Sequence, residues 1–418
     1  MLMERPTEIE CPHPMRFYGP LEEVQPGLAF VPFFANVTVL ETGEGLVLVD
    51  CGGAGTQALY KQVRKWRPNA PIHTVIYTHG HLDHVLGVKT FEKEDKRRTR
   101  VVAHVNVRRR FNRYRLTRGY NGHINMRQFP HVTKPSWPAN WREPDLEYEN
   151  NLVLSIGGEE LHLFHAVGET DDGTWVWIPE RSTICSGDLF IWAFPNCGNP
   201  QKVQRYAQGW IDALLAMAAK KAAVLLPGHG PPITGLRNVE RALKQTAAAL
   251  QLLVSHTVEK MNAGWRLQDV VDSCPPVPAH LLNQPFLRPV YDEPEFVVRN
   301  CWRLWGGWWD GNPAHLHPAS DEALGTEVAT LAGGATVLAK RATQLANSSD
   351  KSWGQAKADL ALAGHLAEFA IKAEPDNAAV RLAYRAVNEA RSRHATSLMA
   401  TNIYGHAARS VDGPAARL

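Results

Sequence analysis

Residues 28–235 alternate short apolar runs with turn residues, a pattern typical of a mixed α/β domain. The apolar stretch 28–50 is interrupted by the turn sequence ETGEG and predicts β-strands on either side of that turn. The segment 56–66 has a helical period and is followed by the β-branched strand sequence HTVIYTH over 73–79. Further elements are expected along the chain: a hairpin over 152–168, two strands over 174–190, a helix over 203–221, and a strand that ends in a glycine-rich loop over 222–235.

The pattern changes towards the C-terminus. The proline-rich segment 274–296 predicts an extended arm or linker. From about residue 320 the sequence is alanine-rich and helical in period, and Pro375 is suited to the first turn of a helix. We therefore expect a catalytic domain over 1–273, an arm over 274–318, and an α-helical domain over 319–418 that serves packing or dimerisation.

Composition and charge narrow the class of protein. The chain has 418 residues, 44% hydrophobic and 21% charged, as in an ordinary globular enzyme. A net charge of +3 does not indicate a nucleic-acid partner, and no apolar run is long enough for a membrane span. The basic run over 96–118 is interpreted first as a solvated surface, and second as a positive rim that steers an anionic substrate. Six scattered cysteines without a C-x-x-C motif, and an N-terminus without an apolar signal region, predict reduced thiols and a cytoplasmic location.

The candidate chemistry begins with YTHGHLDHVLG, residues 77–87. It brings four ligand-type side chains, His79, His81, Asp83 and His84, to the end of a predicted strand. Imidazole nitrogens and carboxylate oxygens are ligands for zinc-type divalent ions. The spacing allows His79 and His81 to share one ion while Asp83 and His84 face a second. The motif therefore predicts a two-metal site with a hydroxide between the ions.

Two later motifs supply further ligands. SGDLF places Asp188 at a strand end, where its carboxylate can bridge both ions, and PGHG exposes His229 on a loop. Either residue alone fits a structural role equally well. Together, and in this order, they support the first motif.

These residues resemble the metallo-β-lactamase fold superfamily over 24 to about 240, which implies an α/β fold with an αββα sandwich, followed here by the all-α domain. That family has a third histidine in a P-G-H-T turn, whereas the matching turn here, AVGETDDG, carries Glu169. His165 is the alternative ligand, and otherwise a partner of a ligand or a structural residue. We favour Glu169.

A glutamate at this position resembles the alkylsulfatase branch, whose members also carry a signature similar to GGWWDGNPAHLHP, here 306–318, and then a helical dimerisation domain. The resemblance implies a dinuclear metallo-hydrolase of sulfuric (alkyl sulfate) esters that uses a metal-bridging hydroxide. It also implies that Asp83 both binds metal and orients the nucleophile, and that the chain forms a homodimer through its C-terminal helices. The well-known members are longer and exported, and they bridge the metals with glutamate where this chain has Asp188, so long-chain sulfates are less expected as substrates.

The small anionic ester needs donors outside the metal site. FLRPVYD resembles a stretch that supplies a sulfate-contacting arginine in alkylsulfatases, which makes Arg288 a candidate, and Arg299 is a second one. Asn196 and Asn199 follow Asp188 and are candidates for the mouth of the site. Trp302, Trp305, Trp308 and Trp309 fall near helical spacing and are interpreted first as part of the core, and second as a contact for a hydrophobic substrate tail.

Other functions stay open at this point. The same fold hosts phosphodiesterases, lactonases and other ester hydrolases, and a metal-bearing scaffold is the non-enzymatic alternative. Zinc is the expected metal, with manganese or iron also compatible with histidine and carboxylate ligands. We expect neither a nucleic-acid nor a membrane partner.

Overall fold

The computed structural model describes residues 13–347 and 353–411. These residues divide into two compact units. Unit 1 comprises residues up to 118 together with 138–308, and unit 2 comprises 119–137 together with the described residues from 309 onwards.

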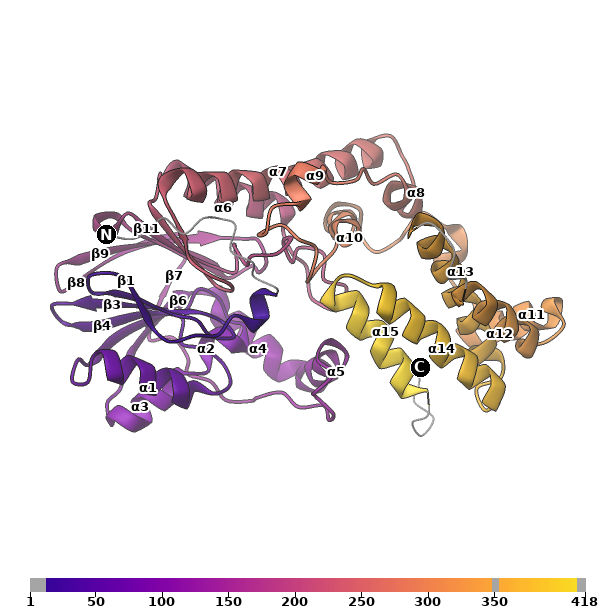
Figure 1. The fold of residues 1–418 in the computed structure, drawn as a ribbon, viewed down its shortest axis with the longest axis horizontal. Coiled ribbons are helices and arrows are strands. Elements are labelled where there is room, and N and C mark those ends of the chain that lie inside the picture. The colour runs from indigo at the N-terminus through magenta and orange to yellow at the C-terminus, as the bar shows by residue number, and fades with distance from the viewer. Residues whose placement is uncertain (1–12, 348–352, 412–418) are drawn as a thin grey trace. The chain divides into compact units, whose positions relative to one another are not determined.

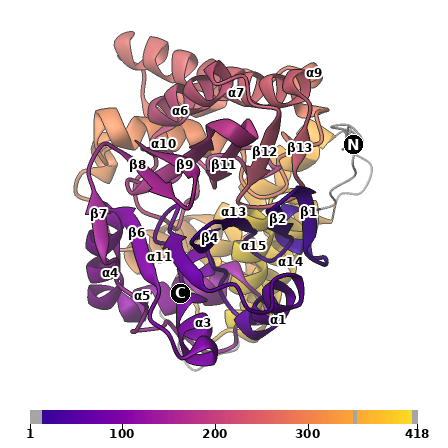
Figure 2. The ribbon, with the colours of Figure 1, turned by 90° about the vertical axis from the view of Figure 1, so that its left-hand side faces the viewer.

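Unit 1 is built around two sheets that lie face to face (Figures 1 and 2). In the first sheet, β1 to β7 follow one another in chain order; in the second, the order is β13-β12-β11-β10-β9-β8. The first sheet contains β1 (Glu22–Gln25), β2 (Leu28–Val31), β3 (Val37–Thr42), β4 (Gly45–Val49), β5 (Ile72–Ile76), β6 (Arg100–His104) and β7 (Leu146–Tyr148). The second contains β8 (Asn151–Ile156), β9 (Glu159–Ala166), β10 (Gly173–Ile178), β11 (Thr183–Gly187), β12 (Val224–Pro227) and β13 (Ile233–Thr234).

Strand direction decides where loops gather. From β4 to β7 the strands are parallel, and β11 pairs in parallel with β12, with Thr183 opposite Val224. The loops that follow β5, β11 and β12 therefore leave from the carboxyl ends of their strands, where α/β folds place their sites.

The core between the sheets is apolar from both sides. Phe30, Val47 and Ile76 from the first sheet pack with Leu161 and Val176 from the second. Because strand side chains alternate between the two faces, the opposite faces need their own cover. Helices supply it: α6 and α7 cover the second sheet, and α1 and α3 pack together beside the first (Figure 2). This is the αββα sandwich, so the predicted fold class is confirmed.

The helices of unit 1 are α1 (Thr56–Trp66), α2 (Leu82–Val85), α3 (Val88–Asp95), α4 (Asn106–Leu116), α6 (Ala207–Ala219), α7 (Leu236–Asn262), α8 (Leu267–Asp272), α9 (Ala279–Leu282) and α10 (Pro294–Gly306). The proline-rich segment 274–296 has little regular structure besides α9 and the first residues of α10. It is not a free arm, however, because Val277, Leu281, Phe286 and Leu287 are buried in the core formed with α6 and α7.

The assignment of four tryptophans to the core is wrong for three of them. Only Trp302 is buried, whereas Trp305, Trp308 and Trp309 are 44%, 73% and 40% exposed. The helical spacing does not persist, because α10 ends at Gly306 and Gly307 adopts φ +84°.

Unit 2 is helical, with α5 (Arg118–Gln128), α11 (Asp321–Ala332), α12 (Ala335–Ala346), α13 (Trp353–Ala373), α14 (Ala378–His394) and α15 (Leu398–Ser410). Its core is rich in alanine, and small side chains let the helices approach closely. Gly325 of α11 lies at one such close approach, where a Cβ would lie 2.8 Å from the carbonyl oxygen of Phe369. Pro375 marks a helix boundary as predicted but lies outside the first turn, because Asn377 is the N-cap of α14 and accepts N–H groups of Ala379 and Val380. None of the helices in the described part of the chain is long and apolar enough to cross a membrane.

Candidate metal centre

The H-x-H-x-D-H motif lies where β5 ends. His79 and His81 are in the loop after the strand, and Asp83 and His84 belong to the short helix α2. The chain is packed tightly here, because a Cβ on Gly53 would lie 2.7 Å from the Cα of Asp83. The turn is therefore held by backbone contacts as well as by its side chains.

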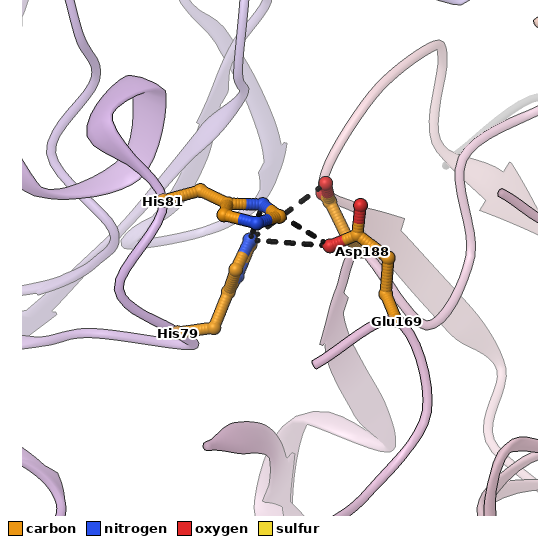
Figure 3. A group of neighbouring side chains, drawn as sticks. All are labelled: His79, His81, Glu169 and Asp188. Atoms are coloured by element: carbon orange, nitrogen blue, oxygen red, sulfur yellow. Dashed lines mark hydrogen bonds and ion pairs between the residues drawn. The ribbon is translucent and has the colours of Figure 1, made fainter. Parts of the chain in front are cut away.

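Three other loops complete the cluster. Glu169 follows β9, Asp188 follows β11 and His229 follows β12. Two groups of ligand-type atoms result, each within 4.8 Å of one another: the first is His79, His81, Glu169 and Asp188, and the second is Asp83, His84 and His229. Figure 3 shows the two histidines of the first group facing the two carboxylates.

Asp188 contacts both groups. Its Oδ2 lies 3.8 Å from His79 Nε2 in the first group and 3.4 Å from His229 Nε2 in the second, and its Oδ1 lies 3.3 Å from His84 Nε2. One carboxylate thus lies between two sets of ligand atoms, the position expected of a bridging ligand.

Three of the imidazole rings are oriented by contacts of Nδ1 with an oxygen atom. Nδ1 of His79 is 3.1 Å from the Thr78 hydroxyl, Nδ1 of His84 is 2.7 Å from Asp50 Oδ2, and Nδ1 of His229 is 2.5 Å from the carbonyl oxygen of Phe34. An Nδ1–H donated to an oxygen leaves Nε2 with a lone pair for a metal.

The donor set fits divalent metal ions. Four buried atoms, His84 Nε2, Glu169 Oε2, Asp188 Oδ1 and His229 Nε2, have no hydrogen-bond partner among the described residues. Buried polar atoms are almost always satisfied, so these atoms of the two ligand groups need partners that the described residues do not supply. Cations can be those partners, and histidine with carboxylate is the chemistry of zinc-type ions.

The pKa shifts of the ligand candidates are consistent with a metal site. Burial would raise the pKa of Asp188, but His229 and His84 hold it well below its usual range. Burial lowers the pKa of His79 well below its usual range, with His84 and His81 adding to the effect. For His84, burial would lower the pKa, yet Asp188, Asp50 and Asp83 raise it well above the usual value. Histidine nitrogens that are held beside carboxylates can bind a metal ion in place of a proton.

Asp50 is a supporting residue that the sequence reasoning missed. It is buried at the end of β4, with φ +61°, and accepts the N–H and O–H of Thr78 at 2.7 Å each as well as the ring of His84. A signal was visible, because an aspartate directly after the fully apolar strand GLVLV has to have partners.

A second missed support holds the loop of the two histidines. Asp172 accepts the N–H of Gly80 at 2.9 Å and pairs with the buried Arg110 of α4 at 2.8 Å. Burial would raise the pKa of Asp172, but Arg110 holds it far below its usual range, so the carboxylate stays ionised.

Glu169 has its own counter-charge. Arg205, which is 2% exposed, places Nη1 2.5 Å from Glu169 Oε1, and Asn196 donates to the same oxygen at 3.1 Å. Burial would raise the pKa of Glu169, but Arg205 and His81 lower it. No pattern in the sequence identified Arg205, because it lies in an irregular segment 36 residues from its partner.

The remaining candidates are not members of either ligand group. His165 is on β9, stacked on His104 at 3.6 Å, with Nδ1 3.0 Å from the carbonyl oxygen of Gly173. Arg288 and Arg299 are exposed, and the Arg299 guanidinium is 3.5 Å from Gln268 Oε1. Their role in substrate binding stays a prediction, as does the ligand role of every residue in the cluster.

The comparisons with known proteins agree with this picture. Residues 30–229 match the Metallo-beta-lactamase superfamily, and residues 266–413 match the family described as Alkyl sulfatase dimerisation. The chain therefore carries a metallo-β-lactamase domain followed by an alkyl sulfatase dimerisation domain.

Within that class, the chain is similar to alkylsulfatases. It is 23% identical over 367 residues to a linear primary-alkylsulfatase of Pseudomonas sp., covering 82% of this chain and 67% of the relative. It is 25% identical over 352 residues to an (R)-specific secondary-alkylsulfatase of Pseudomonas sp., covering 76% and 52%. The fold matches the solved stereoselective inverting sec-alkylsulfatase Pisa1 from Pseudomonas sp. with a TM-score of 0.82 and 22% identity, covering 94% of this chain and 66% of that one. The chain thus spans about half to two thirds of the length of these relatives.

Proposed function

We propose that the protein is a dinuclear metal-dependent hydrolase of sulfuric esters. The contact of Asp188 with both ligand groups carries the dinuclear assignment, because one carboxylate can then serve two ions. The alkylsulfatase relatives and the glutamate in the first ligand group support sulfuric esters as the substrate class.

In this proposal His79, His81 and Glu169 hold the first ion, Asp83, His84 and His229 hold the second, and Asp188 is shared. Zinc is the metal we expect, with manganese or iron as alternatives. When bound, two such ions would lower the pKa of a water molecule and so make a nucleophile available near neutral pH.

The side chains then have separate tasks. Asp83 is the most exposed of the ligand carboxylates, with 28% of its side chain accessible, and we assign to it the orientation of the attacking water and the acceptance of its proton. Arg205 offsets the charge of Glu169, and Asp50 keeps the Nε2 of His84 free for metal. We also propose that the chain forms a homodimer through the dimerisation domain, which a monomer mass in light scattering would contradict.

The test is sulfate release from a panel of short and long alkyl sulfates by zinc- and manganese-loaded protein in water labelled with oxygen-18. Release should require metal and be abolished in Asp83→Ala, whereas Asp212→Ala, at an exposed position on α6, should keep it. The label will appear in the alcohol if the C–O bond breaks and in sulfate if the S–O bond breaks. No release, together with turnover of phosphodiesters or lactones, would reject the sulfuric-ester assignment.

A further inference from the structure

The loop over 196–205, between β11 and α6, is attached to the metal centre at both ends. Asn196 Nδ2 and Arg205 Nη1 both donate to Oε1 of Glu169, and Arg205 also donates to the carbonyl oxygen of Asn196 at 2.6 Å. Both ends of the loop are therefore fixed to a residue of the first ligand group.

The middle of the loop carries a lysine without a counter-ion. Lys202 donates its backbone N–H to the carbonyl oxygen of Asn199 at 3.3 Å, which closes a turn. Within the described part of the chain, its ammonium group makes neither a hydrogen bond nor an ion pair. Burial lowers the pKa of Lys202 to about 8, and Arg205 adds to this, while Glu169 and Asp83 act in the opposite direction. The ammonium thus lies in the electrostatic field of carboxylates from both ligand groups.

A second cation reaches the same loop from α10. The guanidinium of Arg303 donates to Oε1 of Gln204 at 2.9 Å and to Oδ1 of Asn300 at 3.1 Å, and lies 3.5 Å from the carbonyl oxygen of Lys202. All three acceptors are neutral. The Arg303 side chain is exposed and makes no ion pair with a described residue; partial burial, and then Arg205, lower its pKa.

The buried arginine of the loop is also incompletely satisfied. Nε of Arg205 is a buried donor with no hydrogen-bond partner among the described residues, although Nη1 is paired with Glu169. A further cation, Arg113 of α4, also lowers the pKa of Lys202. Its guanidinium lies 4.8 Å from the ring of Tyr114, and its own pKa is lowered by burial.

Cationic groups that have no carboxylate partner are stabilised by an anion that binds beside them. Asp292, a buried carboxyl that accepts the N–H groups of Gly198 in this loop and of Glu293, supplies little balancing charge, because burial raises its pKa to about 7. Ammonium and guanidinium donors without partners are the groups that proteins use to hold sulfate and phosphate oxygens.

We propose that Lys202 and Arg303, presented by the loop over 196–205, form a cradle for the anionic head group of the ester beside the metal centre. This rests on the proposed function, since it assigns the charged oxygens of the same substrate. It also differs from the sequence-based candidates, because Arg288 and Arg299 are not members of the cradle.

The test uses the metal-loaded full chain and two readouts. Inorganic sulfate is titrated by calorimetry, and KM and kcat are measured separately for an alkyl sulfate. Lys202→Gln and Arg303→Gln should each weaken sulfate binding and raise KM by about tenfold to a hundredfold, the range for lost hydrogen bonds to charged groups, with kcat changed far less. Lys202→Arg should recover most of the loss, because it restores the charge.

Lys61→Gln on α1 and Arg237→Gln on α7 are matched controls at exposed positions and should bind sulfate as the parent protein does. Metal content and circular dichroism, unchanged in all variants, separate loss of the cradle from loss of the fold. Sulfate affinity and KM that stay within about twofold of the controls would overturn the cradle. If sulfate binding depends on Lys202 but no sulfuric ester is hydrolysed, the cradle holds and the proposed function fails. If sulfuric esters are hydrolysed and neither variant affects the hydrolysis, the proposed function holds and the cradle fails.

Discussion

Asp292 offers a quantitative test of how this structure treats a buried charge. Its carboxyl is fully buried, with Oδ2 2.7 Å from the backbone nitrogen of Gly198 and Oδ1 2.9 Å from that of Glu293. Burial raises its pKa from 3.8 to about 7, against the lowering effect of these two N–H groups and of Arg205. Asp292→Asn keeps the size of the side chain and removes the ionisation.

The raised pKa of Asp292 determines how the stability of the protein changes with pH. A carboxyl whose pKa is higher in the folded state contributes stability that is fully present below its unfolded pKa and is lost as the pH rises through its folded pKa. A difference of about 3 units corresponds to about 4 kcal/mol in total, of which about 3 kcal/mol is lost between pH 5 and pH 8. The free energy of unfolding of Asp292→Asn, minus that of the parent, should therefore increase by about this amount over that interval.

The assay is urea unfolding of both proteins in chelator at several pH values from 5 to 8, followed by tryptophan fluorescence. Subtracting the two proteins at each pH cancels the titration of every other group. Asp145→Asn is the contrasting control: burial would raise the pKa of Asp145, but Arg98 and Arg142 lower it, so its contribution is complete above pH 5 and its difference from the parent should be flat. A flat difference for Asp292→Asn as well, or one that falls with pH, would refute the reasoning.

Three further outcomes concern the metal centre. Asp50→Asn weakens the acceptor that orients His84 and should lower metal affinity by about tenfold to a hundredfold in competition with a chromophoric chelator. Gly228→Ala would place a Cβ 2.1 Å from Asp188 Oδ1, so bound metal measured by mass spectrometry should fall, whereas Gly119→Ala, with open space around it, should keep the full metal content. Removing metal from the parent protein should lower its free energy of unfolding by about 4 kcal/mol when the free metal had been a thousandfold above its Kd, and an unchanged unfolding curve would contradict a metal site in the folded state.

Much of the fold follows from local patterns. Apolar runs bounded by turn residues predict the strands around the ETGEG turn and after Pro68, and the alanine-rich helical period predicts the helices of unit 2. The failures lie where tertiary packing overrides local composition. The segment 274–296 has the prolines of a linker, yet Phe286 and Leu287 are buried in the core, because their partners come from α6 and α7.

The residues of the site were also only partly predictable from the sequence. The ligand candidates are visible in the sequence because they follow the ends of strands β5, β9, β11 and β12, with Asp83 and His84 in the short helix α2 just after β5. Their supports are not, because each lies on a different element: Asp172 is paired with Arg110 across 62 residues and Glu169 with Arg205 across 36. Only a structure brings such pairs together, since neither partner shows any periodicity of its own.

The pairing of Glu169 with Arg205 changes what the glutamate means for the reaction. A glutamate in place of a neutral histidine adds a negative charge to the first ligand group, which by itself would oppose an anionic substrate. Arg205, 2.5 Å away and equally buried, returns the charge of that group to what a neutral ligand would give. The same arginine also anchors the loop that presents Lys202. In the site that we propose, the departure from histidine therefore does not weaken the binding of anions, because Glu169 is the attachment point of the loop that carries Lys202.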